Sequence, residues 1–134
     1  MEKVFVEIEY TGSNYCAHAP VLQGCVSTGS TLDEVKKNIK EAVEFHVESS
    51  LADGDPIPDV FKGKYELEFK LSAEALLNAY SGVFTKSALS RITGINERQL
   101  WHYAAGVRRP RRVQSQRIMQ GLHKLGQELI SVAL

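Results

Sequence analysis

Four side chains in the C-terminal half of the sequence are of the types that contact base edges in DNA. Glu97, Arg98, Gln99 and His102 fall within one short helical pattern, "ERQLWHYA". In the major groove, arginine binds guanine through two hydrogen bonds, glutamine binds adenine in the same way, and glutamate accepts from cytosine. Each such contact contributes about 1 to 3 kcal/mol of discrimination between bases. The spacing therefore indicates a helix whose exposed N-terminal turn recognises a base sequence.

A second helix and a tight turn are needed to place these side chains in a groove. The pattern predicts a first helix within 85–92, a turn at Gly94, and a second helix over 97–104 with Asn96 as its cap and Gly106 at its end. We count Asn96 among the candidate DNA contacts. The residues expected to pack the two helices together are Leu89, Ile92, Ile95, Leu100 and Tyr103. This is the arrangement of a helix-turn-helix, which lays its second helix in the major groove.

A cluster of arginines follows the second helix. Arg108, Arg109, Arg111 and Arg112 are spaced around Pro110, and we expect them to occupy one loop over the phosphate backbone. Phosphate contacts add affinity without sequence choice and make binding depend on salt. A solvated loop, an RNA-binding patch and a membrane-surface patch are the alternative readings of such a cluster.

The charge distribution separates the two halves of the chain, although the whole sequence has a formal net charge of zero. Residues 1–70 contain seven lysines and no arginine against 13 acidic residues, a net charge of −6. Residues 71–134 carry the opposite charge, +6, from nine basic and three acidic residues. This asymmetry suggests a basic half that meets a polyanion, and an acidic half that does not meet one or that meets a basic protein. Two ordinary surfaces of uneven composition explain it equally well.

The first half has the alternation of strands followed by the periodicity of a helix. Strands are predicted over 3–10, 15–19 and 25–28, then a helix over 32–51 capped by Thr31 or Ser30, then a strand over 64–71. The apolar stripe of that helix is Leu32, Val35, Ile39, Ala42, Val43, Val47 and Leu51. We therefore expect an α+β fold: a β-β-β-α-β layer over residues 1–70.

The second half, residues 71–134, has only helical signals. Ser72 can cap a helix over 73–80, and residues 113–134 supply one or two more helices. The apolar positions Ile118, Leu122, Leu125, Leu129 and Ile130 exceed what a domain of this size buries, so we expect dimerisation through this half. Trp101 directly follows Leu100 and is expected on a partly exposed helix face or in a dimer contact, although it can also stack on a base.

Several kinds of chemistry lack support in the sequence. Cys16 and Cys25 have no ligand spacing, so two reduced thiols are favoured over a disulfide or a zinc site. Glu7 and Glu9 share one strand face, but no third or fourth acid stands out as their partner, and a solvated face explains them equally well. No apolar run approaches the roughly 20 residues of a membrane span. We expect a cytoplasmic, non-enzymatic protein with no cofactor, no metal and no membrane partner.

The segment Thr85–Pro110, "TKSALSRITGINERQLWHYAAGVRRP", resembles the helix-turn-helix of phage repressors. It matches their polar start, leucine, turn glycine, helix cap and closing Gly-x-x-x-Pro; Ser90 stands where alanine is usual. The resemblance implies that Lys86 and Ser87 contact the DNA backbone, while Glu97, Arg98 and His102 face bases.

The segment Tyr15–Ser50 resembles the HicB antitoxin signature. The matching positions are Tyr15, Ala17, Pro20, Leu22, Gly24, Cys25, Thr28, Gly29, Thr31, Glu34, Asn38, Glu41 and Ala42, with Gln23 in place of the usual proline. The resemblance implies a partial ribonuclease-H-like layer that covers a small basic mRNA-cleaving toxin, HicA, while the C-terminal domain represses the operon by binding its operator.

We accordingly expect residues 1–70 to form a toxin-binding domain, and residues 71–134 a helix-turn-helix domain for DNA binding and dimerisation. Toxin contacts are expected at four residues: Tyr15, His18, Pro20 and Gln23. His18 also fits an ordinary half-exposed histidine. The alternative is a free-standing transcriptional regulator whose N-terminal domain binds a different ligand or protein.

Overall fold

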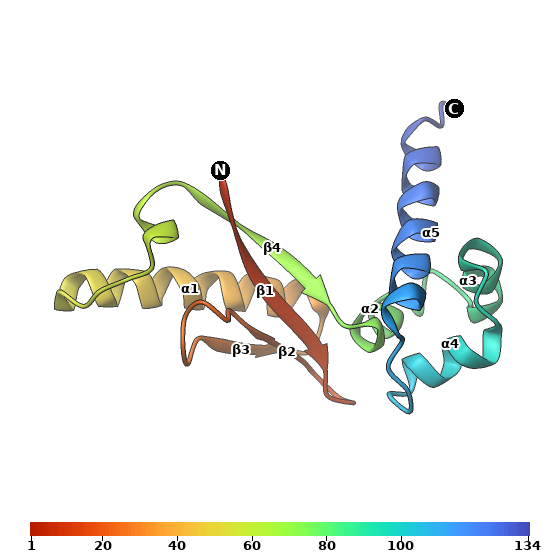
Figure 1. Cartoon of the computed structure of the whole chain (residues 1–134), viewed down its shortest axis with the longest axis horizontal. Coiled ribbons are helices and arrows are strands. Elements are labelled where there is room, and N and C mark those ends of the chain that lie inside the picture. The colour runs from red at the N-terminus through yellow and green to blue at the C-terminus, as the bar shows by residue number, and fades with distance from the viewer. The chain divides into compact units, whose positions relative to one another are not determined.

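The computed structural model describes residues 1–134 and shows an α+β chain made of two units, Met1–Ala75 and Leu76–Leu134 (Figure 1). The first unit holds a four-stranded mixed sheet and a long α-helix, and the second holds only helices. Helix α2 (Ala73–Ala79) crosses the division between them, which lies after Ala75. The sequence placed that division between residues 70 and 71.

The sheet has the strand order β3-β2-β1-β4. Its strands are β1 (Glu2–Tyr10), β2 (Tyr15–His18), β3 (Val26–Gly29) and β4 (Tyr65–Leu71). The first three strands pair antiparallel, whereas β4 pairs parallel to β1. Alternation buries Val4, Val6 and Ile8 on one face of β1, and the register sets Val6 beside Phe69 of β4 on that face. The predicted β-β-β-α-β order is confirmed.

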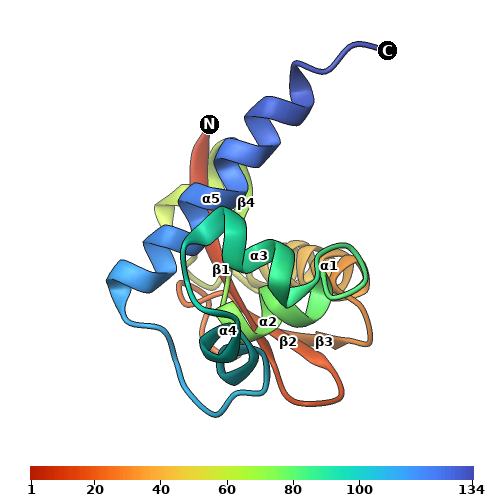
Figure 2. The ribbon, with the colours of Figure 1, turned by 90° about the vertical axis from the view of Figure 1, so that its right-hand side faces the viewer.

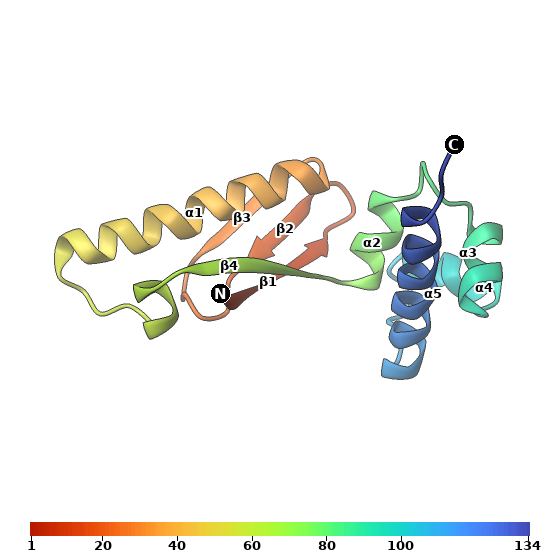
Figure 3. The same cartoon turned by 90° about the horizontal axis from the view of Figure 1, so that it is seen from above.

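Helix α1 (Leu32–Asp53) covers one face of this sheet (Figure 3). The helix begins where predicted, because the Thr31 hydroxyl accepts a hydrogen bond from the Glu34 amide at 3.1 Å. Its buried stripe is Val35, Ile39, Val43 and Val47. Burying such a branched side chain contributes about 1.5 to 3 kcal/mol, so this stripe is the main attachment of helix to sheet.

A close approach joins the start of α1 to β3. A Cβ atom on Gly29 would lie 2.5 Å from the backbone nitrogen of Val35, so only glycine fits at this strand end. The Asn38 side-chain amide donates to the Thr28 carbonyl at 2.9 Å and satisfies an acceptor on an edge strand. The glycine and asparagine of the HicB-like pattern therefore both hold α1 against β3.

One part of the expected helix stripe is wrong. Leu51 is 61% exposed, because α1 continues past the end of the strands and has no sheet beneath its last turn (Figure 3). The helix ends at Gly54, whose φ of 72° lies in the left-handed region. A 3₁₀ helix, η1 (Asp59–Lys62), follows before β4 and was not predicted; it buries Phe61, which contacts Tyr65 edge to face.

The second unit is built from α2 and three further helices: α3 (Lys86–Thr93), α4 (Glu97–Ala104) and α5 (Arg112–Ile130). Its buried apolar residues are Leu77, Leu89, Ile95, Leu100, Tyr103 and Ile118. Four of the five residues predicted to pack α3 on α4 are thus buried, and Ile92 is half-buried. Ser72 caps α2 as expected, accepting from the Ala75 amide at 3.1 Å.

Helices α3 and α4 cross at a steep angle, joined by a three-residue turn (Figure 2). Gly94 takes a φ of 75°, which a side chain would strain. The Thr93 hydroxyl donates to the Leu89 carbonyl at 2.7 Å and accepts from the Ile95 amide at 3.2 Å. The Asn96 carboxamide oxygen then accepts from the Gln99 amide at 2.8 Å and starts α4. The turn is therefore fixed by local hydrogen bonds on both sides.

One helix, α5, forms within the segment 113–134, where one or two were expected. It begins at Arg112, which was expected in a loop, and ends at Ile130. Arg111 occupies the cap position, and the loop retains Arg108, Arg109 and Pro110. Helix α5 packs closely on α3, because a Cβ atom on Gly121 would lie 2.5 Å from the Ile92 carbonyl oxygen.

Candidate functional site

The exposed start of α4 carries two of the predicted base-contacting side chains. Glu97 and Arg98 are exposed in its first turn, while Leu100 and Tyr103 hold the opposite side of the helix in the core. Arg98 makes no ion pair or hydrogen bond, so its guanidinium keeps its donors free for a partner. Asn96 is exposed, but its side-chain oxygen is already engaged in the helix cap.

Gln99 and His102 are half-buried. The Gln99 side-chain amide donates to the Tyr103 hydroxyl at 3.1 Å, which directs it along the helix. His102 Nδ1 is buried without a hydrogen-bond partner.

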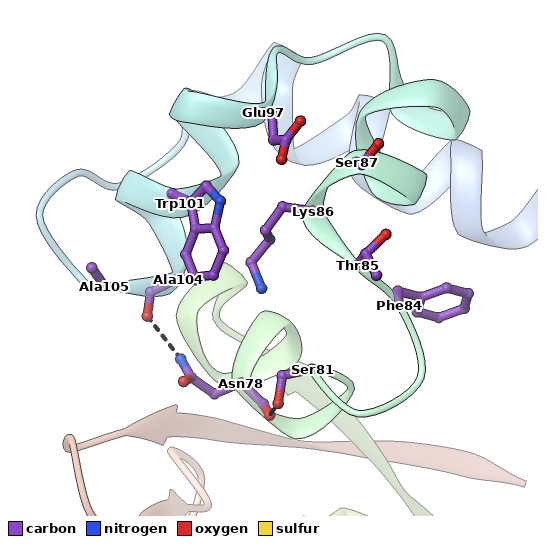
Figure 4. Close-up of a pocket in the computed structure, with 10 residues that line it drawn as sticks. All are labelled: Asn78, Ser81, Phe84, Thr85, Lys86, Ser87, Glu97, Trp101, Ala104 and Ala105. Carbon is purple, nitrogen blue, oxygen red and sulfur yellow. Dashed lines mark hydrogen bonds between the residues drawn. The ribbon is translucent and has the colours of Figure 1, made fainter.

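Lys86, the first residue of α3, is 7% exposed, and its Nζ lies 4.6 Å from the ring centroid of Trp101. Ser87, next to it, is exposed. Figure 4 shows both residues at a cavity of about 540 Å³ within the helical unit. Residues of α2, α3, α4 and the segment before α3 line it: Asn78, Ser81, Phe84, Thr85, Lys86, Ser87, Glu97, Trp101, Ala104 and Ala105. The sequence did not predict the Lys86–Trp101 contact.

Four exposed arginines follow α4: Arg108, Arg109, Arg111 and Arg112. None of them forms an ion pair; the two lysine–carboxylate pairs and the His18–Glu7 contact all lie in the first unit. Backbone hydrogen bonds shape the loop before them, since the amides of Val107 and Arg108 both donate to the His102 carbonyl. A cluster of unpaired guanidinium groups that follows the C-terminal end of α4 is suited to bind a polyanion.

The four residues predicted to contact a toxin have different surroundings. Tyr15 is 6% exposed and packs on Tyr10 with ring centroids 5.0 Å apart, so it belongs to the core. Burial, and to a lesser extent the charge of Tyr10, raises the pKa of Tyr15. Pro20 and Gln23 are exposed in the loop between β2 and β3. Gly24, with a φ of 80°, and the Ala19–Cys25 backbone hydrogen bond give that loop its bend.

His18 lies on the sheet face opposite α1. Its Nε2 is 3.2 Å from Oε2 of Glu7, the residue directly across the β1–β2 pair. Glu9, two positions along β1, is exposed on the same face. No group of three or more His, Cys, Asp or Glu side chains is placed to hold a metal ion. None of the helices is long and apolar enough to cross a membrane.

Comparison with known families identifies the first unit. A family model described as the HicB-like antitoxin of bacterial toxin–antitoxin systems matches residues 3–70, from β1 into β4. The match covers half of the chain and leaves α2 to α5 outside.

Three curated proteins are similar over part of the chain. A UPF0150 protein of Synechocystis is 44% identical over 55 residues, which are 41% of this chain and 68% of that protein. An uncharacterized 14.9 kDa protein from the rep-hol intergenic region of Haemophilus phage HP1 is 41% identical over 51 residues, 38% of each chain. A UPF0150 protein of Helicobacter pylori is 44% identical over 46 residues, 34% of this chain and 64% of that protein. No solved structure matches the chain significantly.

Proposed function

This chain belongs to the HicB-like antitoxin family of bacterial toxin–antitoxin systems, and we propose that it has two activities. Its first unit binds and neutralises a small basic HicA-type toxin that cuts mRNA. Its second unit binds operator DNA through α3 and α4 and represses the operon that encodes both proteins. The family match over residues 3–70 is the observation that carries the antitoxin role.

Charge complementarity supports the toxin partner. Residues 1–70 have a net charge of −6, and an RNA-cleaving toxin must be basic where it holds its substrate. Complementary fields speed the encounter of two proteins more than they set the final affinity. The exposed loop residues Pro20 and Gln23, with His18 on the adjoining strand, remain the proposed contacts; Tyr15 acts from the core by supporting β2.

Three features support the DNA partner. The start of α4 presents Glu97 and Arg98 to solvent, and His102 is half-buried on the same helix. The four arginines of 108–112 have no acidic partner within the chain. Ser87 is exposed at the start of α3, where helix amides favour a phosphate group. These groups provide base contacts and backbone contacts in one unit.

The test of the antitoxin role uses the full chain and the product of the adjacent reading frame. That product's cleavage of an RNA substrate is followed while the chain is titrated in. We expect cleavage to disappear at a stoichiometric ratio. A His18→Ala, Gln23→Ala double variant should need a higher concentration, whereas Lys62→Ala, which alters an exposed residue of η1, should behave like the unmodified chain. Absence of both binding and inhibition would contradict the proposal and favour a free-standing regulator.

A further inference from the structure

Trp101 is the single tryptophan of the chain, and the activities proposed above leave it without a role. It lies in the middle of α4 and is 56% exposed. An indole ring combines a large apolar surface with a polar N–H group, and tryptophan is for that reason enriched at interaction surfaces. The position of the ring therefore needs an explanation in terms of a partner.

The geometry of α4 places Trp101 on the same outward side as Arg98. Successive residues of an α-helix are rotated by about 100°, so Trp101 is about 60° from Arg98 around the axis. Leu100 and Tyr103 define the inward side, and both are buried. Gln99, in contrast, is turned toward the flank, where it bonds Tyr103. Trp101 is thus closer to the centre of the exposed face than Gln99 is.

Lys86 fixes the indole ring in this place. Its Nζ lies over the ring, 4.6 Å from the centroid, and Figure 4 shows the lysine reaching from α3 toward the tryptophan. Lys86 makes no ion pair and no hydrogen bond, so the ring is the close partner of its ammonium group. A cation over an aromatic face contributes about 0.5 to 2 kcal/mol, more as the pair loses water. A ring held in place before binding loses less entropy on binding.

We propose that Trp101 recognises thymine in the major groove by apolar contact with its C5-methyl group, and that Lys86 is the positioning residue that holds the indole for this contact. The methyl group of thymine is the apolar feature of the major-groove base edges. A ring beside Arg98 on the face presented to the groove has the chemistry for it. This inference rests on the proposed operator binding. It also gives Lys86 a different role from the backbone contact that the sequence resemblance implied.

The experiment begins with duplexes selected from a random library by the full chain. Thymines of the selected site are then replaced one at a time by deoxyuridine, which removes only the methyl group. We expect the unmodified chain to lose about threefold to tenfold in affinity at one or two of these positions, the effect of a buried methyl group. At those positions, Trp101→Ala should bind the thymine duplex and the deoxyuridine duplex with equal affinity. Arg98→Ala should bind both more weakly but keep the ratio of the two affinities found for the unmodified chain. The matched control is Phe45→Ala, which removes an exposed aromatic side chain of the first unit and should leave the ratio of affinities unchanged.

Lys86→Met separates positioning from phosphate contact, because methionine keeps most of the length and loses the charge. If Lys86 positions the indole, the variant should show a smaller ratio of thymine-duplex affinity to deoxyuridine-duplex affinity, and the salt dependence of binding should not change. A phosphate contact predicts the opposite: an unchanged ratio and a log–log salt slope reduced by about 0.9. That second result would overturn the role assigned to Lys86.

Two further outcomes distinguish this inference from the proposed function. If the unmodified chain selects no sequence at all, operator binding itself is wrong. If the chain selects a site but Trp101→Ala still binds the thymine duplex more tightly than the deoxyuridine duplex, Trp101 is not a base contact. The same holds if Trp101→Ala changes the mass of the protein in solution. In both cases only the inference fails. Far-ultraviolet circular dichroism of each variant checks that the helices are retained.

Discussion

At the scale of single residues, the proposed DNA complex predicts that some basic side chains of the second unit select a sequence and others add affinity. Arg98 is on the exposed start of α4, whereas Arg109 lies in the loop before α5. A guanidinium that holds guanine through two hydrogen bonds acts on one base pair, and one that neutralises a phosphate acts on every sequence equally.

Arg98→Ala is accordingly expected to weaken binding to the selected site by about 5- to 150-fold, from the loss of 1 to 3 kcal/mol, with little effect on random DNA. Arg109→Ala should weaken binding to the selected site and to random DNA alike, and it should reduce the slope of log affinity against log salt concentration by about 0.9. Fluorescence anisotropy at several salt concentrations measures both quantities. Lys62→Ala removes a positive charge from the other unit and is the control. Equal losses for Arg98 and Arg109 on both kinds of DNA would contradict this division of roles.

The two cysteines are also expected to differ. Burial raises the pKa of the Cys25 thiol, so a smaller fraction is thiolate at any given pH, and the same burial limits access. Cys16 is half-exposed on the sheet face opposite α1. Iodoacetamide at pH 8 should therefore alkylate Cys16 first, giving one adduct in the intact mass before a second appears.

A Cys16→Ser variant should then show only the slow reaction, and urea should make both thiols of the unmodified chain react rapidly. Similar rates for the two cysteines in the native protein would show that the bend at Ala19–Cys25 opens more readily than its backbone hydrogen bonds suggest.

Contacts between residues three or four positions apart could be predicted from the sequence, whereas contacts between different helices could not. Thr31, Ser72 and Asn96 were identified as caps because a cap depends on three or four consecutive residues. The Lys86–Trp101 contact depends on how α3 packs against α4, and spacing alone holds no information about it. For the same reason Tyr15 was expected to contact a partner, whereas the fold places it in the core.

At the scale of elements, the structure contains a matched pair of glycines in α5. A Cβ atom on Gly121 would lie 2.5 Å from the Ile92 carbonyl oxygen, but nothing lies within 4 Å of one on Gly126. Gly121→Ala should destabilise the second unit by about 1 to 3 kcal/mol, because α5 must move away from α3. Gly126→Ala should stabilise it by roughly 0.5 to 1 kcal/mol through helix propensity. Urea unfolding followed by Trp101 fluorescence measures both changes.

If both substitutions shifted the urea midpoint in the same direction, the close packing of α5 on α3 would not hold in solution. The fluorescence signal is specific to this unit, since the first unit contains no tryptophan.

The order of elements was predictable from periodicity, and their spatial pairing was not. The alternation in "KYELEFKL" indicates a strand, but not that β4 joins β1 in parallel at an edge of the sheet. Leu51 continues the helical period of α1, yet it is exposed because the sheet ends before the helix does. Periodicity describes one element, whereas burial depends on the length of its neighbour.

At the scale of the whole molecule, each charged half of the sequence corresponds closely to one folded unit. The acidic segment 1–70 lies within Met1–Ala75, and all nine basic residues of the second half lie in Leu76–Leu134. The proposed toxin and the proposed operator would then meet units of opposite net charge.

Helix α5 gives the final prediction, which concerns assembly. Ile118 is buried, Leu122 and Leu125 are half-buried, and Leu129 and Ile130 are 59% and 79% exposed, so the apolar stripe continues beyond the part that packs within the unit. A second copy of the same stripe is a self-complementary partner, which a two-fold dimer requires. We expect light scattering to give the mass of two chains.

A Leu129→Asp, Ile130→Asp double variant should give the mass of one chain, because a dimer would bury both charges without a partner. Gln127→Asp adds a charge at an exposed polar position of the same helix and should leave the dimer intact. The dimer also predicts half-sites about 34 Å, or a multiple of that, apart in the selected DNA, and the double variant should lose affinity for the paired site but keep it for a single half-site. A single-chain mass for the unmodified protein would refute assembly through α5 and remove the reason for a two-fold operator.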